Sequence, residues 1–397
     1  MIKSYKYRLN PNNEQRIFFE KSFGCARYVY NWALNKRIEA YQTSKERLSC
    51  VDLCKMLTPL KKEEDKLWLN EVSNECLQQS IRNMDSAFTK FFRDKKGFPK
   101  FKSKKDNRKS YKAINHVEFD FGNHKVKLPK IGWVNFYSNR EFEGKTGTAT
   151  ISKTPTGKYY ISVVVDDGIT APNKPVISES TSVGIDVGIK DFAVLSNGDT
   201  FANPKFLENS SKRLAVLQRR LAKKVKGSKR RDKARLALAK QYERITNQRT
   251  NFIHQVTSKI ISENQTVIIE DLNVSGMLKN HCLAKSISSA SWSEFFRQLD
   301  YKAEWYGCNV IQIGQFAPSS KMCGCGYINK ELKLSDRSWK CPMCRAENDR
   351  DLLAAQNIKR FGLQSQNLIG ISPVVHGVED VELSALVGAK KRQYMEV

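Results

Sequence analysis

Three acidic residues stand in or beside segments that are otherwise apolar, and they limit how this chain can fold. Asp186 lies within Gly184–Gly188, a predicted strand with a glycine on each side. Glu270 follows the apolar run Val267–Ile269, and Asp351 opens a predicted helix. A carboxylate costs free energy in such surroundings unless it is paired or binds a metal ion. Each acid alone has an ordinary explanation, such as a neighbouring lysine or a helix cap, so the constraint comes from the set.

The order of these acids along the chain is that of RNase H-like nucleases, in which an early strand, a later strand and a C-terminal helix each carry one. Carboxylate oxygens are the ligands that Mg²⁺ and Mn²⁺ prefer. Phosphodiester cleavage uses two divalent ions roughly 4 Å apart. We therefore predict that carboxylates from these three elements converge into a site that binds Mg²⁺ or Mn²⁺.

Four of the ten cysteines form two pairs, Cys323 with Cys325 and Cys341 with Cys344, with fifteen residues between the pairs. Such clustering is typical of a structural Zn²⁺ site in a reducing compartment. The second pair has the usual gap of two residues, whereas the first has a gap of one. The other six cysteines are expected to be small core residues.

The chain carries 68 Lys and Arg residues against 41 Asp and Glu residues, a formal net charge of +27. This excess predicts a polyanionic partner, and nucleic acid is the usual one because each neutralised phosphate releases counterions. A basic binder of the ribosomal type is the simplest alternative, but this chain is elaborate for that class. No apolar run is long enough to span a bilayer, and residues 1–9 lack the apolar core of a signal peptide. We expect a cytoplasmic protein, on the nucleoid when bound to DNA, with no membrane partner.

Two stretches concentrate the positive charge. Residues 93–112 hold ten Lys and Arg residues against two Asp, with aromatic residues among them, a composition that suits a groove along a nucleic-acid backbone. Residues 212–244 hold fourteen against two acids. An exposed basic surface without a partner is the alternative in both cases. The nucleic-acid contacts that we predict are Lys95, Lys96, Lys100, Lys102, Lys104 and Lys105 in the first stretch, and Arg219, Arg220, Lys223 and Lys224 in the second.

Periodicity divides the chain into segments. Residues 2–9 and five short runs within 117–165 alternate like strands, and residues 13–92 are helical in pattern. Residues 171–175 are typical of a linker. Beyond it we predict strands within 183–195, at 267–269 and at 309–313, and helices over 206–242 with a break at 227–228, over 248–263, over 291–306 and over 351–361.

Several motifs together resemble TnpB, the OrfB protein of insertion sequences and a relative of type V CRISPR effectors. The similarity covers residues 6–362. It rests on Tyr5–Pro11 and Phe23–Asn31 near the start, on Gly97–Lys102, and on the segments around the three acids, Gly184–Gly188, Ile269–Asn273 and Asp349–Asp351. Pro318–Lys321 before the cysteines and Asn357–Ile358 complete the pattern. One position departs from it, because Leu353 stands where the family usually has an asparagine.

The resemblance implies an α/β multidomain architecture with an RNase H-like (RuvC) nuclease core and an inserted zinc ribbon. An N-terminal β-barrel wedge domain would contain a helical recognition insert. The implied bounds are 1–12 and 111–170 for the wedge, 13–110 for the recognition domain, 181–319 and 347–362 for the nuclease, 320–346 for the zinc ribbon and 363–397 for a flexible tail.

The resemblance also implies an RNA-guided endonuclease whose catalytic residues and metal ligands are Asp186, Glu270 and Asp351. Its guide RNA would derive from the transposon right end, and its target would be double-stranded DNA beside a short adjacent motif. Base pairing would then read the sequence, while the protein holds the heteroduplex by shape and charge. We place the reader of the adjacent motif on the polar face of the helix over 74–92, with Gln78, Gln79 and Arg82.

Two other functions stay open at this point. A guided DNA-binding repressor that no longer cuts would be expected to lack one of the acids, and all three are present. A transposase that performs strand transfer itself is the other alternative. The five histidines contain no His-hydrophobe-His pair, which excludes one class of transposase, while an RNase H-type transposase stays open. The sequence carries no signal for the oligomeric state, and we expect a monomer.

Overall fold

The computed structural model describes residues 1–106, 108–333 and 335–367. It divides into two compact units, Met1–Thr170 and Ala171–Val397. Within the described residues, no helix combines the length and the apolarity needed to cross a bilayer.

The first unit is built on an antiparallel sheet of seven strands in the order β2-β6-β7-β1-β5-β4-β3. Its strands are β1 (Ile2–Leu9), β2 (Lys109–Ala113), β3 (Glu118–Asp120), β4 (Lys125–Leu128), β5 (Gly132–Tyr137), β6 (Lys145–Lys153) and β7 (Tyr159–Asp166). Burial alternates along β7, where Tyr159, Ile161, Val163 and Val165 are buried, so one face of the sheet forms the core.

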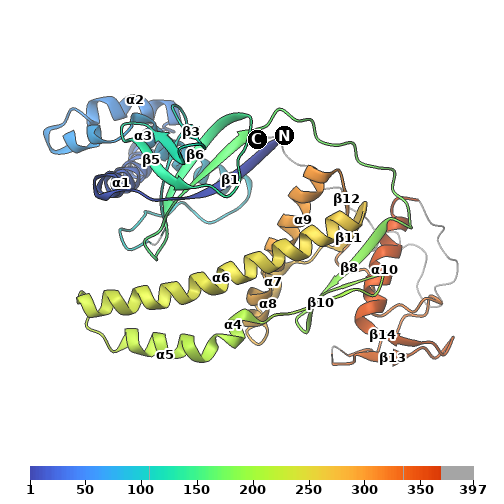
Figure 1. Ribbon diagram of the computed structural model, residues 1–397. Coiled ribbons are helices and arrows are strands. Elements are labelled where there is room, and N and C mark those ends of the chain that lie inside the picture. Colours follow the sequence, from blue (N-terminus) through green and yellow to red (C-terminus); the bar gives the residue numbers. More distant parts are fainter. Residues whose placement is uncertain (107, 334, 368–397) are drawn as a thin grey trace. The chain divides into compact units, whose positions relative to one another are not determined.

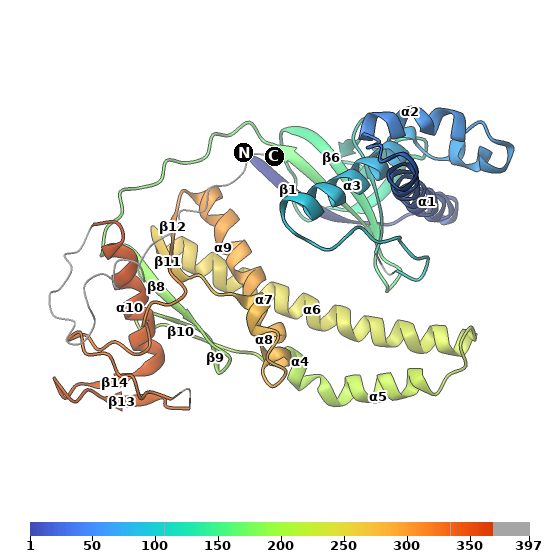
Figure 2. The same cartoon turned by 180° about the vertical axis from the view of Figure 1, so that it is seen from behind.

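The helices of this unit follow β1. They are α1 (Asn13–Ser44), α2 (Cys50–Leu60), the 3-10 helix η1 (Glu64–Glu71) and α3 (Asn74–Arg93). Asn12 and Gln15 form a reciprocal capping box that starts α1, and Ser49 with Asp52 does the same for α2. A second apolar cluster joins the helices to one another, and Figures 1 and 2 show α1 and α3 packed side by side.

The second unit contains a five-stranded sheet in the order β10-β9-β8-β11-β12. Its strands are β8 (Ser182–Val187), β9 (Asp191–Leu195), β10 (Thr200–Ala202), β11 (Thr266–Glu270) and β12 (Asn309–Ile313). β8, β11 and β12 are parallel to one another, whereas β9 and β10 are antiparallel additions. The carboxyl ends of β8 and β11 therefore lie at the same edge of the sheet.

Helices cover both faces of this sheet (Figure 1). They are α4 (Phe206–Asn209), α5 (Ser211–Ala222), α6 (Lys229–Glu263), α7 (Val274–Met277), α8 (Ala284–Ala290), α9 (Trp292–Tyr306) and α10 (Arg350–Gln364). The C-terminal half of α6 and α9 share a core with Val183 and Ile185 on one face. On the other face, Ile268 packs against α10. The N-terminal half of α6 pairs with α5 and extends away from the sheet.

Several expectations needed correction. The separate helix predicted over 248–263 is wrong, because α6 runs without interruption from Lys229 to Glu263. Strand β2 overlaps the end of the basic stretch 93–112, where no strand was predicted. The expected barrel is not closed by hydrogen bonds among the described residues, since β2 and β3 end the sheet without pairing with each other. Residues 363–367 continue α10 and a following turn, and the rest of the predicted tail lies outside the described residues.

One substitution tests the packing of α10 on the sheet. A Cβ atom added to Gly184 would lie 2.2 Å from the backbone oxygen of Ala355, so Gly184→Ala must push strand and helix apart. We expect a loss of about 1–3 kcal/mol, seen as faster hydrogen exchange of the β8 and β11 amides. Gly24→Ala is the matched control because its added Cβ meets nothing within 4 Å. Unchanged exchange in Gly184→Ala would contradict this packing.

Candidate active site and cysteine cluster

Strand register brings Asp186 and Glu270 together. Ile185 pairs with Ile269 in the parallel β8–β11 ladder, so the next residue of each strand is an acid at the same edge. Alternate residues of a strand face opposite ways. Ile185 and Ile269 face α6 and α9, so Asp186 and Glu270 both face the side on which α10 lies.

The third acid reaches this edge from α10. Asp351 is in the first turn of the helix, and the cap is its neighbour Asp349, whose Oδ1 accepts bonds from the backbone N–H groups of Asp351 and Leu352 at 3.0 and 2.9 Å. The ordinary capping role thus belongs to Asp349, and the Asp351 carboxylate is left for another partner. The set of Asp186, Glu270 and Asp351 is called the acidic site below.

The electrostatics of Asp186 reflect this crowding. Burial, followed by repulsion from Glu270 and Asp351, raises the pKa of Asp186 to about 7, and only Arg350 opposes the shift. Burial also raises the pKa of Glu270. Within the folded chain these carboxylates therefore hold protons more tightly than free side chains do.

A buried serine orients Glu270. The Ser319 hydroxyl donates to Oε1 of Glu270 at 2.5 Å, a bond that favours the ionised carboxylate. Ser319 is itself fixed by Asn357 on α10, whose Nδ2 donates to the backbone oxygens of Ser319 and Met322 at 2.7 and 2.6 Å. The loop before the cysteines is thereby tied both to β11 and to α10.

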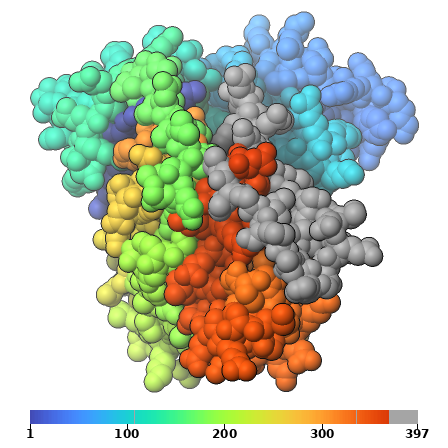
Figure 3. Space-filling model, turned by 90° about the vertical axis from the view of Figure 1, so that its right-hand side faces the viewer, coloured from blue at the N-terminus to red at the C-terminus, as the bar shows by residue number. Residues whose placement is uncertain are grey.

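A cation approaches the acidic site from between the two cysteine pairs. Nη1 of Arg337 lies 3.6 Å from Oδ2 of Asp351. The backbone N–H of Arg350 donates to the oxygen of Arg337 at 2.9 Å, which holds the two segments together. In the space-filling view the residues that contain the cysteines, in orange, adjoin those of α10, in red (Figure 3).

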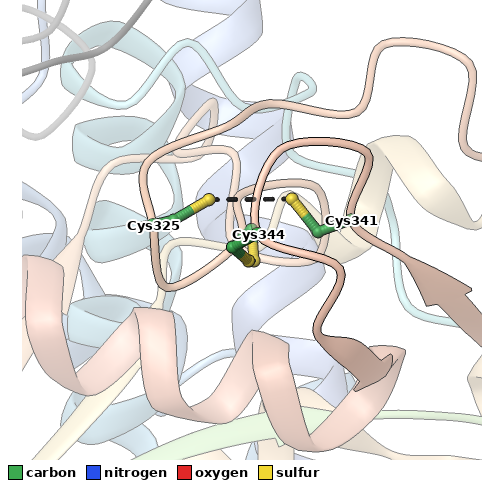
Figure 4. A group of neighbouring side chains, drawn as sticks. Cys325, Cys341 and Cys344 are labelled. Atoms are coloured by element: carbon green, nitrogen blue, oxygen red, sulfur yellow. Dashed lines mark hydrogen bonds between the residues drawn. The ribbon is translucent and has the colours of Figure 1, made fainter.

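The four predicted zinc ligands gather in one place. Their sulfur atoms all lie within 4.8 Å of one another, with 3.6 Å between Cys323 and Cys344 and 3.6 Å between Cys325 and Cys341 (Figure 4). Four sulfurs at 2.3 Å from one zinc ion would lie roughly 3.8 Å apart. Within the described parts of the chain, these thiols form the one group of three or more His, Cys, Asp or Glu side chains whose ligand atoms lie this close together.

Two turns present these sulfurs. In the first, the Cys323 amide donates to the oxygen of Tyr327 at 2.8 Å, and Gly326 has a φ of 93°. In the second, the Cys341 amide donates to the oxygen of Ala346 at 2.9 Å, between β13 (Ser338–Lys340) and β14 (Glu347–Asp349). The gap of one residue in the first pair is therefore compatible with two sulfurs that point at the same centre.

The donor set also suits a metal cation chemically. Burial tends to raise the pKa of Cys341, but hydrogen bonds from the backbone amides of Cys344 and Met343 outweigh it and lower this pKa to about 7. Thiolates are the form in which cysteine binds zinc. We refer to residues 320–346 as the cysteine ribbon.

The predicted nucleic-acid contacts are exposed, with one exception among the glutamines. All ten basic residues predicted as contacts have exposed side chains, and those of the second stretch lie on or directly after α5. In α3, Arg82 is exposed and Gln78 is half-buried. Gln79 is only 7% exposed, so its placement on the polar face was wrong.

Sequence reasoning did not assign three residues that support the acidic site: Ser319 and Arg337, which contact Glu270 and Asp351, and Asn357, which holds Ser319. Ser319 and Asn357 stand in the segments that carry the family resemblance, but their polarity alone did not show that they would be buried together. Arg337 has no local signal, since its contact with Asp351 depends on the fold of the cysteine ribbon.

Comparison with known proteins agrees with these features. Residues 161–281 match a family model described as a probable transposase of the OrfB type, residues 1–46 match a helix-turn-helix domain of the same group, and residues 292–358 match a Cas12f1-like TNB domain. The solved complex of Cas12f1 with guide RNA and target DNA shares the fold, with a TM-score of 0.55 at 17% identity, over 88% of this chain and 83% of that one.

Relatives extend over nearly the whole chain. A Streptomyces pristinaespiralis protein provisionally named an RNA-guided DNA endonuclease is 39% identical over 369 residues, which cover 91% of this chain and 89% of the relative. An Escherichia coli protein with the same provisional name is 29% identical, over 91% of this chain and 92% of its own length. This chain therefore belongs to the OrfB/TnpB family.

Proposed function

We propose that this protein is an RNA-guided endonuclease that cuts double-stranded DNA at the acidic site. The proposal is supported chiefly by the strand register, which puts Asp186 and Glu270 on the same face at one edge of the sheet, and by Asp351 in the first turn of α10, whose charge adds to the repulsion on Asp186. The strand order β10-β9-β8-β11-β12, which is 3-2-1-4-5 within the unit, supports a RuvC-like core of residues 181–319 and 347–362. The names of the relatives support the RNA guide and the DNA target.

The three carboxylates would be the ligands of Mg²⁺ or Mn²⁺. When bound, these ions supply an activated water and stabilise the leaving oxygen of the phosphodiester. Ser319 would position the Glu270 carboxylate for this task, because its hydroxyl already donates to it. Arg337 would pair with Asp351 and bring positive charge to a site that must accept a phosphate.

The remaining parts of the chain would hold the nucleic acids or a structural metal ion. The basic stretches over 93–112 and 212–244 would hold the guide RNA and its heteroduplex with DNA, and residues 1–12 with 111–170 and 13–110 would form the wedge and recognition domains. Gln78 and Arg82 of α3 would contribute to reading the adjacent motif. The cysteine ribbon would bind one structural Zn²⁺ ion.

Removing one carboxylate tests the catalytic assignment. Asp186→Ala should lower cleavage of a guide-matched duplex in Mg²⁺ by at least about a thousandfold, because the ligand set is incomplete. Binding of the same duplex should persist. Asp271→Asn is the matched control, since this adjacent carboxylate is held by Nε2 of Gln312 at 2.9 Å instead. If Asp186→Ala cuts as well as the parent protein, the assignment fails.

The pKa of Asp186 predicts a pH-dependent stability. An acid whose pKa is raised by folding stabilises the fold fully below its unfolded pKa, near 3.8, and that contribution is lost as pH rises through about 7. Without added divalent ions, Asp186→Asn should therefore be more stable than the parent at pH 8, by up to roughly 4 kcal/mol, with no gain near pH 4.

Urea denaturation at several pH values measures this difference. The exposed Asp199, in the turn between β9 and β10, provides the control variant Asp199→Asn, which should show no such trend. If the difference in stability between Asp186→Asn and the parent protein does not change with pH, folding does not raise the pKa of Asp186.

Zinc content tests the cysteine ribbon. The purified chain should hold one zinc ion, and Cys344→Ser and Cys325→Ser should each lose most of it, because four sulfurs gather around one centre. Elemental analysis gives the readout, and Cys282→Ser, an exposed cysteine outside the ribbon, is the control. Full zinc retention in Cys325→Ser would exclude the shortened pair from the ligand set.

A further inference from the structure

The first unit contains a small cavity that the proposed cleavage chemistry does not use. It measures about 100 Å³ and lies among α1, α3, β2, β6 and the segment before β2. The charged side chains that line it are five bases and one acid: Arg27, Lys102, Arg108, Lys109, Lys112 and Asp106. This cavity is called the basic pocket below.

The positive charge of the basic pocket is poorly neutralised by the protein. Lys109 pairs with Glu20 at 2.8 Å, but the same carboxylate also serves Lys153 at 2.6 Å. Within the described residues, Arg27, Arg108 and Lys112 have no ion pair. Several like charges around one cavity repel each other unless an anion enters.

The walls of the pocket are held in place before any ligand binds. Asn31 on α1 clamps the backbone of Lys102 with two hydrogen bonds, of 2.9 and 2.7 Å. The ammonium of Lys102 lies 3.9 Å from the centre of the Tyr30 ring, and burial lowers its pKa. Arg27 shares one face of α1 with Phe23 and Asn31, at a spacing of four residues. Such preorganisation reduces the entropy lost on binding.

The volume of the pocket limits its occupant. A volume of about 100 Å³ accommodates a single phosphate group with an adjoining edge of sugar. The floor is closed by the rings of Phe23 and Tyr111, 5.8 Å apart, so an anion there would meet cations in partly dry surroundings.

The polar lining favours RNA over DNA. Asp106 would repel a phosphate, but its carboxylate can accept a hydrogen bond from a hydroxyl group. One of its oxygens already accepts from the Arg108 amide at 3.0 Å, which fixes it in place and leaves further acceptor capacity. Asn83 and Ser103 add neutral partners. The 2′-hydroxyl, a donor and an acceptor, is the group by which proteins tell RNA from DNA.

We propose that the basic pocket binds one ribose-phosphate unit of an RNA strand, with the phosphate between Arg27 and Arg108 and the 2′-hydroxyl toward Asp106. The inference rests on the proposed function in that it assigns a contact to the guide RNA. It adds Arg27 and Asp106 to the RNA-binding residues. It also distinguishes this pocket from the exposed basic residues of the stretches 93–112 and 212–244.

The test compares RNA and DNA on the same variants of the full chain. Arg27→Gln/Arg108→Gln should weaken binding of a single-stranded RNA oligonucleotide of mixed sequence by at least about tenfold, and reduce the salt dependence of binding by about 0.7 per lost phosphate contact. Asp106→Asn should reduce the preference for RNA over DNA of the same sequence. Arg47→Gln, an exposed arginine outside the pocket, controls for charge loss.

The outcomes are distinguishable from failure of the proposed function, because RNA affinity is measured without cleavage and Asp186→Ala tests cleavage alone. Thermal unfolding confirms that each variant is folded. Equal losses for RNA and DNA would replace the proposal with a general phosphate contact. RNA binding in the double variant that matches Arg47→Gln would overturn it.

Discussion

The close contact between β8 and α10 at Gly184 is the constraint on which the acidic site depends. Because Gly184 has no side chain, the backbone of α10 at Ala355 and Lys359 can lie directly on the strand. Any larger residue would lift the helix and carry Asp351 away from the sheet edge. Ala355 lies one helical turn after Asp351, so this close contact is directly next to the carboxylate that it positions.

In this arrangement, the packing that buries the strands is also electrostatically unfavourable for the acids that they carry. Apolar side chains on both faces of the sheet bury β8 and β11, yet Asp186, the residue before the last of β8, and Glu270, the last residue of β11, are acids. Burial and mutual repulsion raise the pKa of Asp186, so the fold stores unfavourable free energy at the point where it would bind metal. The charge of Arg350 offsets part of that cost, and the hydrogen bond from Ser319 favours the ionised form of Glu270. Functional sites commonly contain such a locally unfavourable interaction in a fold that is otherwise favourable.

The regular elements of the second unit could be predicted because their patterns are strong. β8, β11 and β12 are short apolar runs with sharp ends, and α9 follows a clear helical period. The prediction failed where local signals conflict with tertiary packing. The helices predicted over 206–242 and 248–263 left out residues 243–247, yet α6 continues through them, and its Ile245 and Ile253 are both buried.

For the same reason, the sequence did not predict which residues distant along the chain would pack against one another. The polarity of Gln79 placed it at the surface, but it is buried in α3 beside Ser80, and the alternation of Tyr111 and Ala113 that makes β2 a strand was hidden among lysines. Motifs could name Asp186, Glu270 and Asp351, since each stands at the end of an apolar element. They could not show which residues of the intervening segments would support them.

The cysteine ribbon illustrates why those supporting residues matter. It lies between the segment of Ser319 and the start of α10, and it therefore connects the residue that orients Glu270 with the helix that carries Asp351. Arg337 is held by the backbone of Arg350 and reaches Asp351 from within the ribbon. A metal ion that fixed the four sulfurs would thus also fix the position of this arginine. The ribbon is accordingly better understood as a support of the acidic site than as an independent module, because its folding and the geometry of Asp351 share the same hydrogen bonds.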